Sequence, residues 1–91
     1  MDLRHNEQQS QYEAVIDGHV ALSAYDLEEP DSIVFTHTEV PKELEGRGVG
    51  KELVRFALDD ARRRKLTVVP QCAFVASFIK RNDEYQDLLR K

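Results

Sequence analysis

The sequence predicts a mixed α+β domain in which an antiparallel meander of three strands precedes a helix, a parallel strand and a second helix, in the order β-β-β-α-β-α. Two observations favour this fold. Residues 11–41 are rich in strand-forming residues and are interrupted by two turns, whereas apolar residues recur at helical spacing within residues 48–64. A glycine-rich stretch, residues 45–50, separates the two halves. Because the chain has 91 residues, we expect a single domain over residues 1–91.

The composition is that of an ordinary globular protein, with 41% hydrophobic and 33% charged residues. A net charge of −4 argues against a non-specific nucleic-acid partner, which usually requires a basic excess. No apolar run approaches the roughly 20 residues that a membrane span needs, and residues 1–15 lack the apolar core of a signal peptide. We therefore expect a cytoplasmic protein with no membrane partner. The single cysteine, Cys72, excludes an internal disulfide.

The first half is expected to form three antiparallel strands. Asp17-Gly18, within residues 11–27, is a strong hairpin signal, and residues 28–31 provide a second turn. Residues 32–41 then follow as a β-branched strand that stops at a proline. Strict alternation along this third strand predicts two sets of side chains. One face carries Ile33, Phe35, His37 and Glu39, and the other carries Val34, Thr36, Thr38 and Val40.

The second half is expected to be helical around one short strand. A helix over about residues 48–64 ends in a run of basic residues, which favour the negative end of the helix dipole. Residues 66–70 form a strand that pairs parallel to the third strand. Residues 73–81 form a second helix, and residues 82–90 a final helical turn. The first helix should bury Val49, Leu53, Val54, Ala57, Leu58 and Ala61, and the second Phe74, Val75, Phe78 and Ile79.

Three of the four glycines lie where the last meander strand is followed by the start of the first helix. Free backbone N–H groups and the positive end of the helix dipole meet there, which suits an anion such as a phosphate. A P-loop is excluded because three residues, not four, separate Gly46 from Gly50. A dinucleotide fingerprint is excluded because Leu53 stands where its third glycine belongs. A glycine-rich turn with nothing bound remains the structural alternative.

The stretch Glu45-Gly46-Arg47-Gly48-Val49-Gly50 resembles the acetyl-CoA pyrophosphate loop of the GNAT superfamily of N-acetyltransferases, Arg/Gln-x-x-Gly-x-Gly/Ala. The chain is most similar to the short members of about 90 residues. These carry, in order, the motif found here at residues 37–41, the glycine loop, the Pro-x-Cys and aromatic of residues 70–74, and the Glu-Tyr of residues 84–85. The resemblance covers about residues 11–90. It implies acetyl-CoA as cosubstrate, no metal, and cofactor contacts from Val40, Glu45, Gly46, Arg47, Gly48, Val49, Gly50 and Lys51.

The sequence departs from the larger members of this superfamily in three respects. Glu45 replaces the first Arg or Gln of the loop, which removes a side-chain contact to phosphate and leaves the backbone contacts. Larger members carry a tyrosine in the last helix that protonates the leaving thiolate; near the expected place this sequence has Ile79 and Lys80, and Tyr85 comes later in the chain. The helices and final strands that build the acceptor cleft are absent from the sequence. The resemblance therefore implies an open acceptor site or one that a protein partner completes.

Three side chains are candidates for acetyl transfer to an amine, which needs a base and a proton for the departing thiolate. His37 and Glu39 lie where the resemblance places the thioester, and either could accept the proton of the amine. The alternatives are structural: the histidine could bond a neighbouring strand, and the glutamate could be solvated at the strand end. Cys72 lies at a helix N-terminus, which favours the thiolate. It could take the acetyl group, protonate CoA, or simply pack. The other histidines have no partners at metal-binding spacing, so no metal is expected.

These observations favour a small acetyl-CoA-dependent N-acetyltransferase that transfers an acetyl group from the CoA thioester to an amine. The first alternative is a module that binds CoA or acyl-CoA without efficient turnover. The second is a small protein-interaction domain in which the glycine turn is only structural. The sequence leaves open the acceptor amine, the identity of the base and the role of Cys72.

Overall fold

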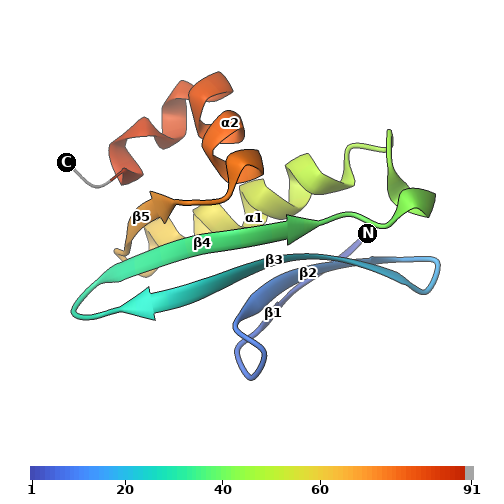
Figure 1. The fold of residues 1–91 in the computed structure, drawn as a ribbon, viewed down its shortest axis with the longest axis horizontal. Coiled ribbons are helices and arrows are strands. Elements are labelled where there is room, and N and C mark those ends of the chain that lie inside the picture. The colour runs from blue at the N-terminus through green and yellow to red at the C-terminus, as the bar shows by residue number, and fades with distance from the viewer. Residues whose placement is uncertain (90–91) are drawn as a thin grey trace.

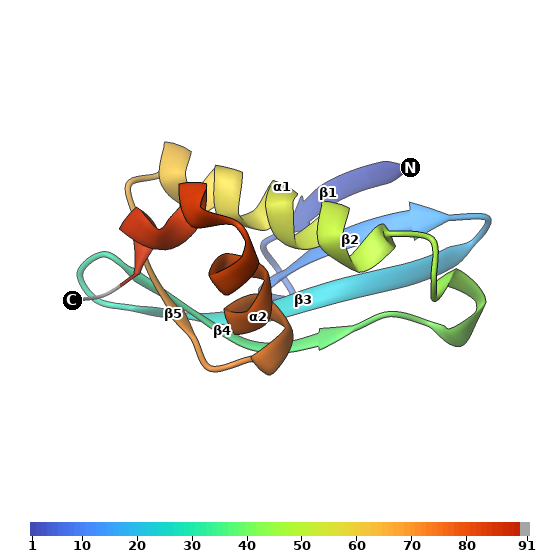
Figure 2. The same ribbon diagram turned by 90° about the horizontal axis from the view of Figure 1, so that it is seen from above.

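The computed structural model describes residues 1–89 as one five-stranded sheet with two helices on the same side (Figures 1 and 2). The strands lie side by side in sequence order. The first four strands pair antiparallel with one another, and the fifth strand is parallel to the fourth. The elements are β1 (Asp2–Asn6), β2 (Gln11–Ile16), β3 (His19–Glu28), β4 (Ser32–Glu39), η1 (Lys42–Leu44), α1 (Val49–Arg63), β5 (Thr67–Pro70), α2 (Ala73–Arg81) and η2 (Asp83–Leu88).

The predicted α+β class, the meander, both helices and the parallel strand are confirmed. All six residues predicted for the buried face of α1 are buried in the core between the sheet and the helices. On α2, three of the four predicted residues are buried, but the prediction for Phe74 was wrong, because this side chain is 40% exposed. Within the described chain, no helix is long and apolar enough to cross a membrane.

Strand β1 was not predicted, so the observed order is β-β-β-β-α-β-α. Its five residues contain one apolar side chain, Leu3, and give no alternating apolar pattern. Besides its antiparallel pairing with β2, the strand is attached through a histidine side chain. The ring of His5 stacks on Tyr12, with centroids 4.2 Å apart, and its Nε2 lies 2.6 Å from the hydroxyl of Tyr25.

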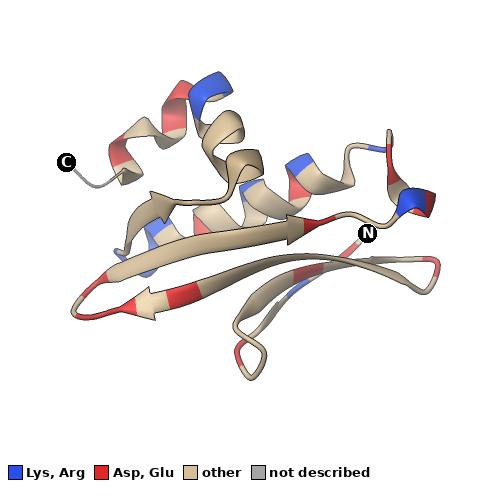
Figure 3. Cartoon of the chain, viewed as in Figure 1, with Lys and Arg blue, Asp and Glu red and all other residues tan. Residues whose placement is uncertain are grey.

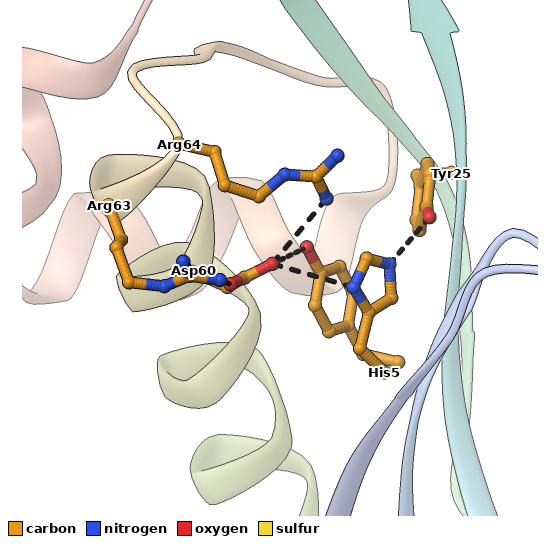
Figure 4. A network of polar contacts seen from close by, with 6 residues as sticks. His5, Tyr25, Asp60, Arg63 and Arg64 are labelled. Carbon is orange, nitrogen blue, oxygen red and sulfur yellow. Dashed lines mark hydrogen bonds and ion pairs between the residues drawn. The ribbon is translucent and has the colours of Figure 1, made fainter.

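The second attachment of β1 is a polar cluster around Asp60 near the C-terminal end of α1 (Figure 4). The Tyr12 hydroxyl donates a hydrogen bond to Asp60 at 2.7 Å, and His5 Nδ1 lies 3.6 Å from the same carboxylate. Arg63 also bonds Asp60. Burial disfavours the charged form of this carboxylate and by itself would raise its pKa. The hydrogen bonds from Tyr12 and Arg63 outweigh burial, so the pKa of Asp60 is lowered. Burial and the same bond raise the pKa of Tyr12.

A β-bulge interrupts the pairing of β3 with β4. Phe35 lies opposite Tyr25 and His37 lies opposite Ala24, so one extra residue, Thr36, is inserted in β4. An extra residue reverses the alternation of side chains beyond it. Strict alternation was therefore wrong for the end of this strand.

After the bulge, Thr38 faces the helices, next to the buried Ser23. His37 and Glu39 face the opposite, uncovered side of the sheet, where both side chains are more than half exposed. This corrects the prediction that they share a face with Ile33 and Phe35, both of which are fully buried.

Candidate functional site

Strand β4 is longer than the strand beside it, and this difference opens the sheet at one edge. β5 pairs with β4 from Ser32 to Phe35 and then ends at Pro70. β4 continues to Glu39, so its last four residues have no strand partner on that side among the described residues. The chain turns away into α2, held by a 2.9 Å hydrogen bond from the Cys72 N–H to the Phe35 carbonyl. The unpaired edge runs from this point toward the glycine loop.

The glycine loop gives α1 a bare N-terminus. Gly46 and Gly48 have φ angles of +78° and +74°, which glycine adopts readily and other residues avoid. A Cβ atom on either would meet nothing within 4 Å, so the space beside the backbone is open. No side chain caps the first turn of α1. Its free N–H groups and dipole therefore present an open site for an anion.

The third glycine has a different purpose. A Cβ atom on Gly50 would lie 2.6 Å from the ring of Phe74 and 3.3 Å from Val40. The missing side chain of Gly50 therefore lets the ring of Phe74, in the first turn of α2, lie close against α1. Phe74 thus packs against α1 at the surface and is 40% exposed.

A surface cavity of about 380 Å³ lies over this loop. Seven of the eight residues predicted to bind the cofactor line it, together with two that were missed, Leu44 and Phe74. The exception is Arg47, which points to the β2–β3 hairpin and lies 3.7 Å from Asp17. The predicted residues that line the cavity are Val40, Glu45, Gly46, Gly48, Val49, Gly50 and Lys51.

A second cavity, of about 580 Å³, adjoins the first between α1 and α2, and the two share Lys51 and Phe74. Its walls combine the basic side chains of Lys51, Arg55 and Arg81 with two phenylalanine rings. Figure 3 shows basic residues on both helices. A sequence signal for this basic wall was overlooked: Lys51 and Arg55 are four residues apart and therefore share a helix face.

Cys72 lies at the N-cap of α2, as predicted, and is 8% exposed. Its Sγ donates a hydrogen bond to Thr38 Oγ1 at 3.3 Å. Thr38 Oγ1 in turn lies 3.1 Å from the hydroxyl of Ser23, a residue with no exposed surface. The thiol thus lies on the helix-covered side of the open edge.

His37 and Glu39 lie on the other side of the same edge. Their side chains are 59% and 61% exposed, and His37 Nε2 is 3.5 Å from Glu39 Oε1. The structure therefore separates the two expected bases from Cys72 by the plane of the sheet.

The hydroxyl of Tyr85 is engaged in a hydrogen bond with a residue of α1. It donates to Asp59 at 2.7 Å, and burial together with this bond raises the pKa of Tyr85. Residues 1–89 contain no group of three or more acidic, histidine or cysteine side chains that could hold a metal ion.

Comparison with known proteins agrees with this architecture. A family model described as GCN5-related N-acetyl-transferase matches residues 11–88. The mouse protein NATD1 is 29% identical over 90 residues, which cover 97% of this chain and 82% of NATD1. The Xenopus tropicalis NATD1 is 27% identical with nearly the same coverage. The solution structure of a candidate GCN5-like N-acetyltransferase from Staphylococcus aureus superposes with a TM-score of 0.77 at 26% identity, covering 98% of this chain and 87% of that one.

The fold thus matches that of a small GCN5-like protein. The family match covers most of the chain. The chain belongs to the GCN5-related N-acetyltransferase family.

Proposed function

We propose that the protein transfers an acetyl group from acetyl-CoA to an amine at the unpaired edge of β4. The observation that carries this proposal is the early end of β5 at Pro70, which leaves residues 36–39 of β4 open between the glycine loop and Cys72. An extended thiol arm bearing amide groups can hydrogen-bond a free strand edge as an additional strand would. The pantetheine arm of CoA has this chemistry.

The two cavities fit the remainder of the cofactor. The pyrophosphate would lie in the open space beside Gly46 and Gly48, against the first N–H groups of α1. The adenosine end, with its additional phosphate, would reach the neighbouring cavity, where Lys51, Arg55 and Arg81 supply positive charge. Phe74, which lines both cavities, would lie at the junction.

In this arrangement the acetyl group lies at the strand edge, and the amine arrives from the uncovered side of the sheet. His37 and Glu39 lie on that side and would take the proton of the amine, directly or through water. The nitrogen lone pair forms the new C–N bond, and backbone N–H groups at the free edge stabilise the oxyanion. When the tetrahedral intermediate collapses, the C–S bond breaks and its electron pair leaves with the CoA sulfur.

Cys72 lies on the opposite side of the edge and has two chemically balanced roles. As an acid, its S–H bond breaks and the proton passes to the CoA thiolate. As a nucleophile, its thiolate first takes the acetyl group, CoA leaves as a thiolate, and the amine then attacks the new thioester. An acetyl adduct on Cys72 after incubation with acetyl-CoA alone identifies the nucleophile. Slower turnover of Cys72→Ala without an adduct on the native protein identifies the acid.

The proposed function is tested by the release of free CoA from acetyl-CoA with and without a primary amine, such as a lysine-containing peptide. We expect release that depends on the amine and is reduced in Cys72→Ala. Binding of acetyl-CoA in a calorimeter with no release in the presence of any amine would instead identify a CoA-binding module. The uncovered face beside His37 favours this alternative when no partner is present, because no described element forms the wall of an acceptor cleft there. A protein partner that covers this face would complete the acceptor site.

A further inference from the structure

Ser23 is a polar residue in the core whose role the proposed mechanism does not yet explain. It has no exposed surface and alternates with the buried Ala21 and Tyr25 along β3. A buried hydroxyl is unfavourable unless it is hydrogen-bonded. Its side-chain partner is Thr38 Oγ1, 3.1 Å away on the neighbouring strand. Thr38 Oγ1 is also the acceptor for the thiol of Cys72, at 3.3 Å.

These three groups form a line that starts inside the sheet and ends at the site, and the β-bulge makes it possible. Without the extra residue at Thr36, strict alternation would turn Thr38 away from Ser23 and from Cys72. Ser23 and Thr38 are directly opposite one another across β3 and β4. The backbone of Cys72 is fixed to β4 through Phe35. The line therefore joins three elements at fixed positions.

We propose that Ser23 and Thr38 form a reversible hydroxyl relay that stabilises the thiolate of Cys72. With the thiol protonated, Cys72 donates to Thr38. When the sulfur loses its proton, the Thr38 hydroxyl rotates and donates to the sulfur, and Ser23 donates to Thr38. The bond to an anionic sulfur is stronger than the one from a neutral thiol, which is a weak donor. The relay therefore favours the thiolate.

Thr38 is a positioning residue in this scheme, because it acts through Cys72. The catalytic consequence rests on the proposed function, but it does not depend on which role Cys72 has. A thiolate is left behind when Cys72 protonates CoA, and a thiolate attacks when Cys72 is the nucleophile. In either case the electron pair of the broken S–H bond stays on a sulfur that faces the Thr38 hydroxyl.

The charged groups on the neighbouring elements remain the same in every variant of the test. His37 and Glu39 on β4 face the uncovered side, and Lys51, Arg55 and Arg81 border the cavities between the helices. A change in thiolate population between variants of Ser23 or Thr38 therefore reports on the hydroxyls. Cys72 is the only cysteine, so the ultraviolet absorbance of the thiolate reports on it alone after subtraction of the spectrum of Cys72→Ala.

The experiment measures the ratio of thiolate to thiol at one mildly alkaline pH in the native protein and in four variants. Thr38→Val keeps the shape of the side chain and removes the hydroxyl, and we expect this ratio to fall about fivefold, the effect of one net hydrogen bond. Ser23→Ala should lower it by a smaller factor. Thr38→Ser should restore it to within about twofold of the native value. Thr36→Val is the matched control, because its hydroxyl bonds the Ala24 carbonyl and not the sulfur.

An unchanged ratio in folded Thr38→Val would overturn the proposal. If Thr38→Val does not fold, an unchanged ratio of thiolate to thiol in Ser23→Ala would also overturn the proposal. Turnover provides a separate readout. We expect Thr38→Val to lower kcat for acetyl transfer while the KM for acetyl-CoA stays the same. The absorbance measurement needs no cosubstrate. If the ratio is lowered in Thr38→Val but the native protein transfers no acetyl group, the result would support the relay and contradict only the proposed function.

Discussion

The substitution Gly50→Ala should separate the stability of the fold from binding of the cofactor. The new Cβ would lie 2.6 Å from Phe74 Cζ, whereas ordinary contact begins at 3.4 Å, so the ring must move by about 0.8 Å or rotate away. Phe74 is 40% exposed and has room to do so. Alanine also favours the helix by up to about 1 kcal/mol over glycine. The free energy of unfolding should therefore stay unchanged or rise by up to that amount.

Binding should respond in the opposite direction, because the displaced ring lines both cavities. We expect the Kd for acetyl-CoA to rise by about tenfold, the effect of losing roughly 1.4 kcal/mol of contact with the displaced ring. Urea unfolding and titration calorimetry measure the two effects. In the background of Phe74→Ala the clash is absent, so adding Gly50→Ala should then change the Kd little. A folded Gly50→Ala protein that binds acetyl-CoA as tightly as the native chain would refute the placement of the cofactor beside Phe74.

Three further predictions follow from the same geometry. Arg81→Ala should weaken binding of acetyl-CoA by about tenfold but leave acetylated pantetheine unaffected, since only the former carries the phosphates that its cavity would hold; equal losses would contradict this assignment. Of His37→Gln and Glu39→Gln, the one that removes the base should lower kcat by about 10²-fold with little change in Kd; a pH–rate profile that neither variant alters would exclude both. Asp60→Asn should lower stability at neutral pH by about 1–2 kcal/mol, because Tyr12 and Arg63 bond the carboxylate.

The pH dependence of protein stability provides a second test of the role of Asp60. Its pKa in the folded protein is lowered from the ordinary 3.8, so its stabilising effect is complete above that value and is lost as the pH falls through the lower folded value. The native chain should therefore lose stability in acid more steeply than Asp60→Asn. Parallel acid unfolding curves for the two proteins, followed by circular dichroism, would contradict the role of this cluster.

The parts of the fold that follow periodicity were predictable from the sequence. The six apolar positions of α1 predicted from helical spacing are all buried. Strand β1 was missed because its attachment depends on His5 and a polar cluster, which leave no apolar pattern. The bulge at Thr36 was missed because an inserted residue changes pairing without changing composition.

The same reasons explain which parts of the candidate site were predictable. The glycine loop follows a spacing rule, and most of its predicted residues line one cavity. Phe74 was assigned to the core from helical periodicity, whereas its ring packs at the surface of α1 in the space that a Cβ on Gly50 would occupy. The face of His37 and Glu39 and the bond between Cys72 and Thr38 both depend on the bulge, so alternation alone could not give them.

The most direct test of the central claim is a titration of the ¹⁵N-labelled protein with acetyl-CoA, followed through the backbone amide signals. We predict that the largest shifts fall in three segments: the free edge at residues 36–40, the loop at residues 46–51, and the start of α2 at residues 72–74. Amides of β1 and of the cluster around Asp60 should hardly move. Saturable shifts centred on β1 and β2, or no shifts at millimolar acetyl-CoA, would contradict the claim that this edge of the sheet holds the cosubstrate.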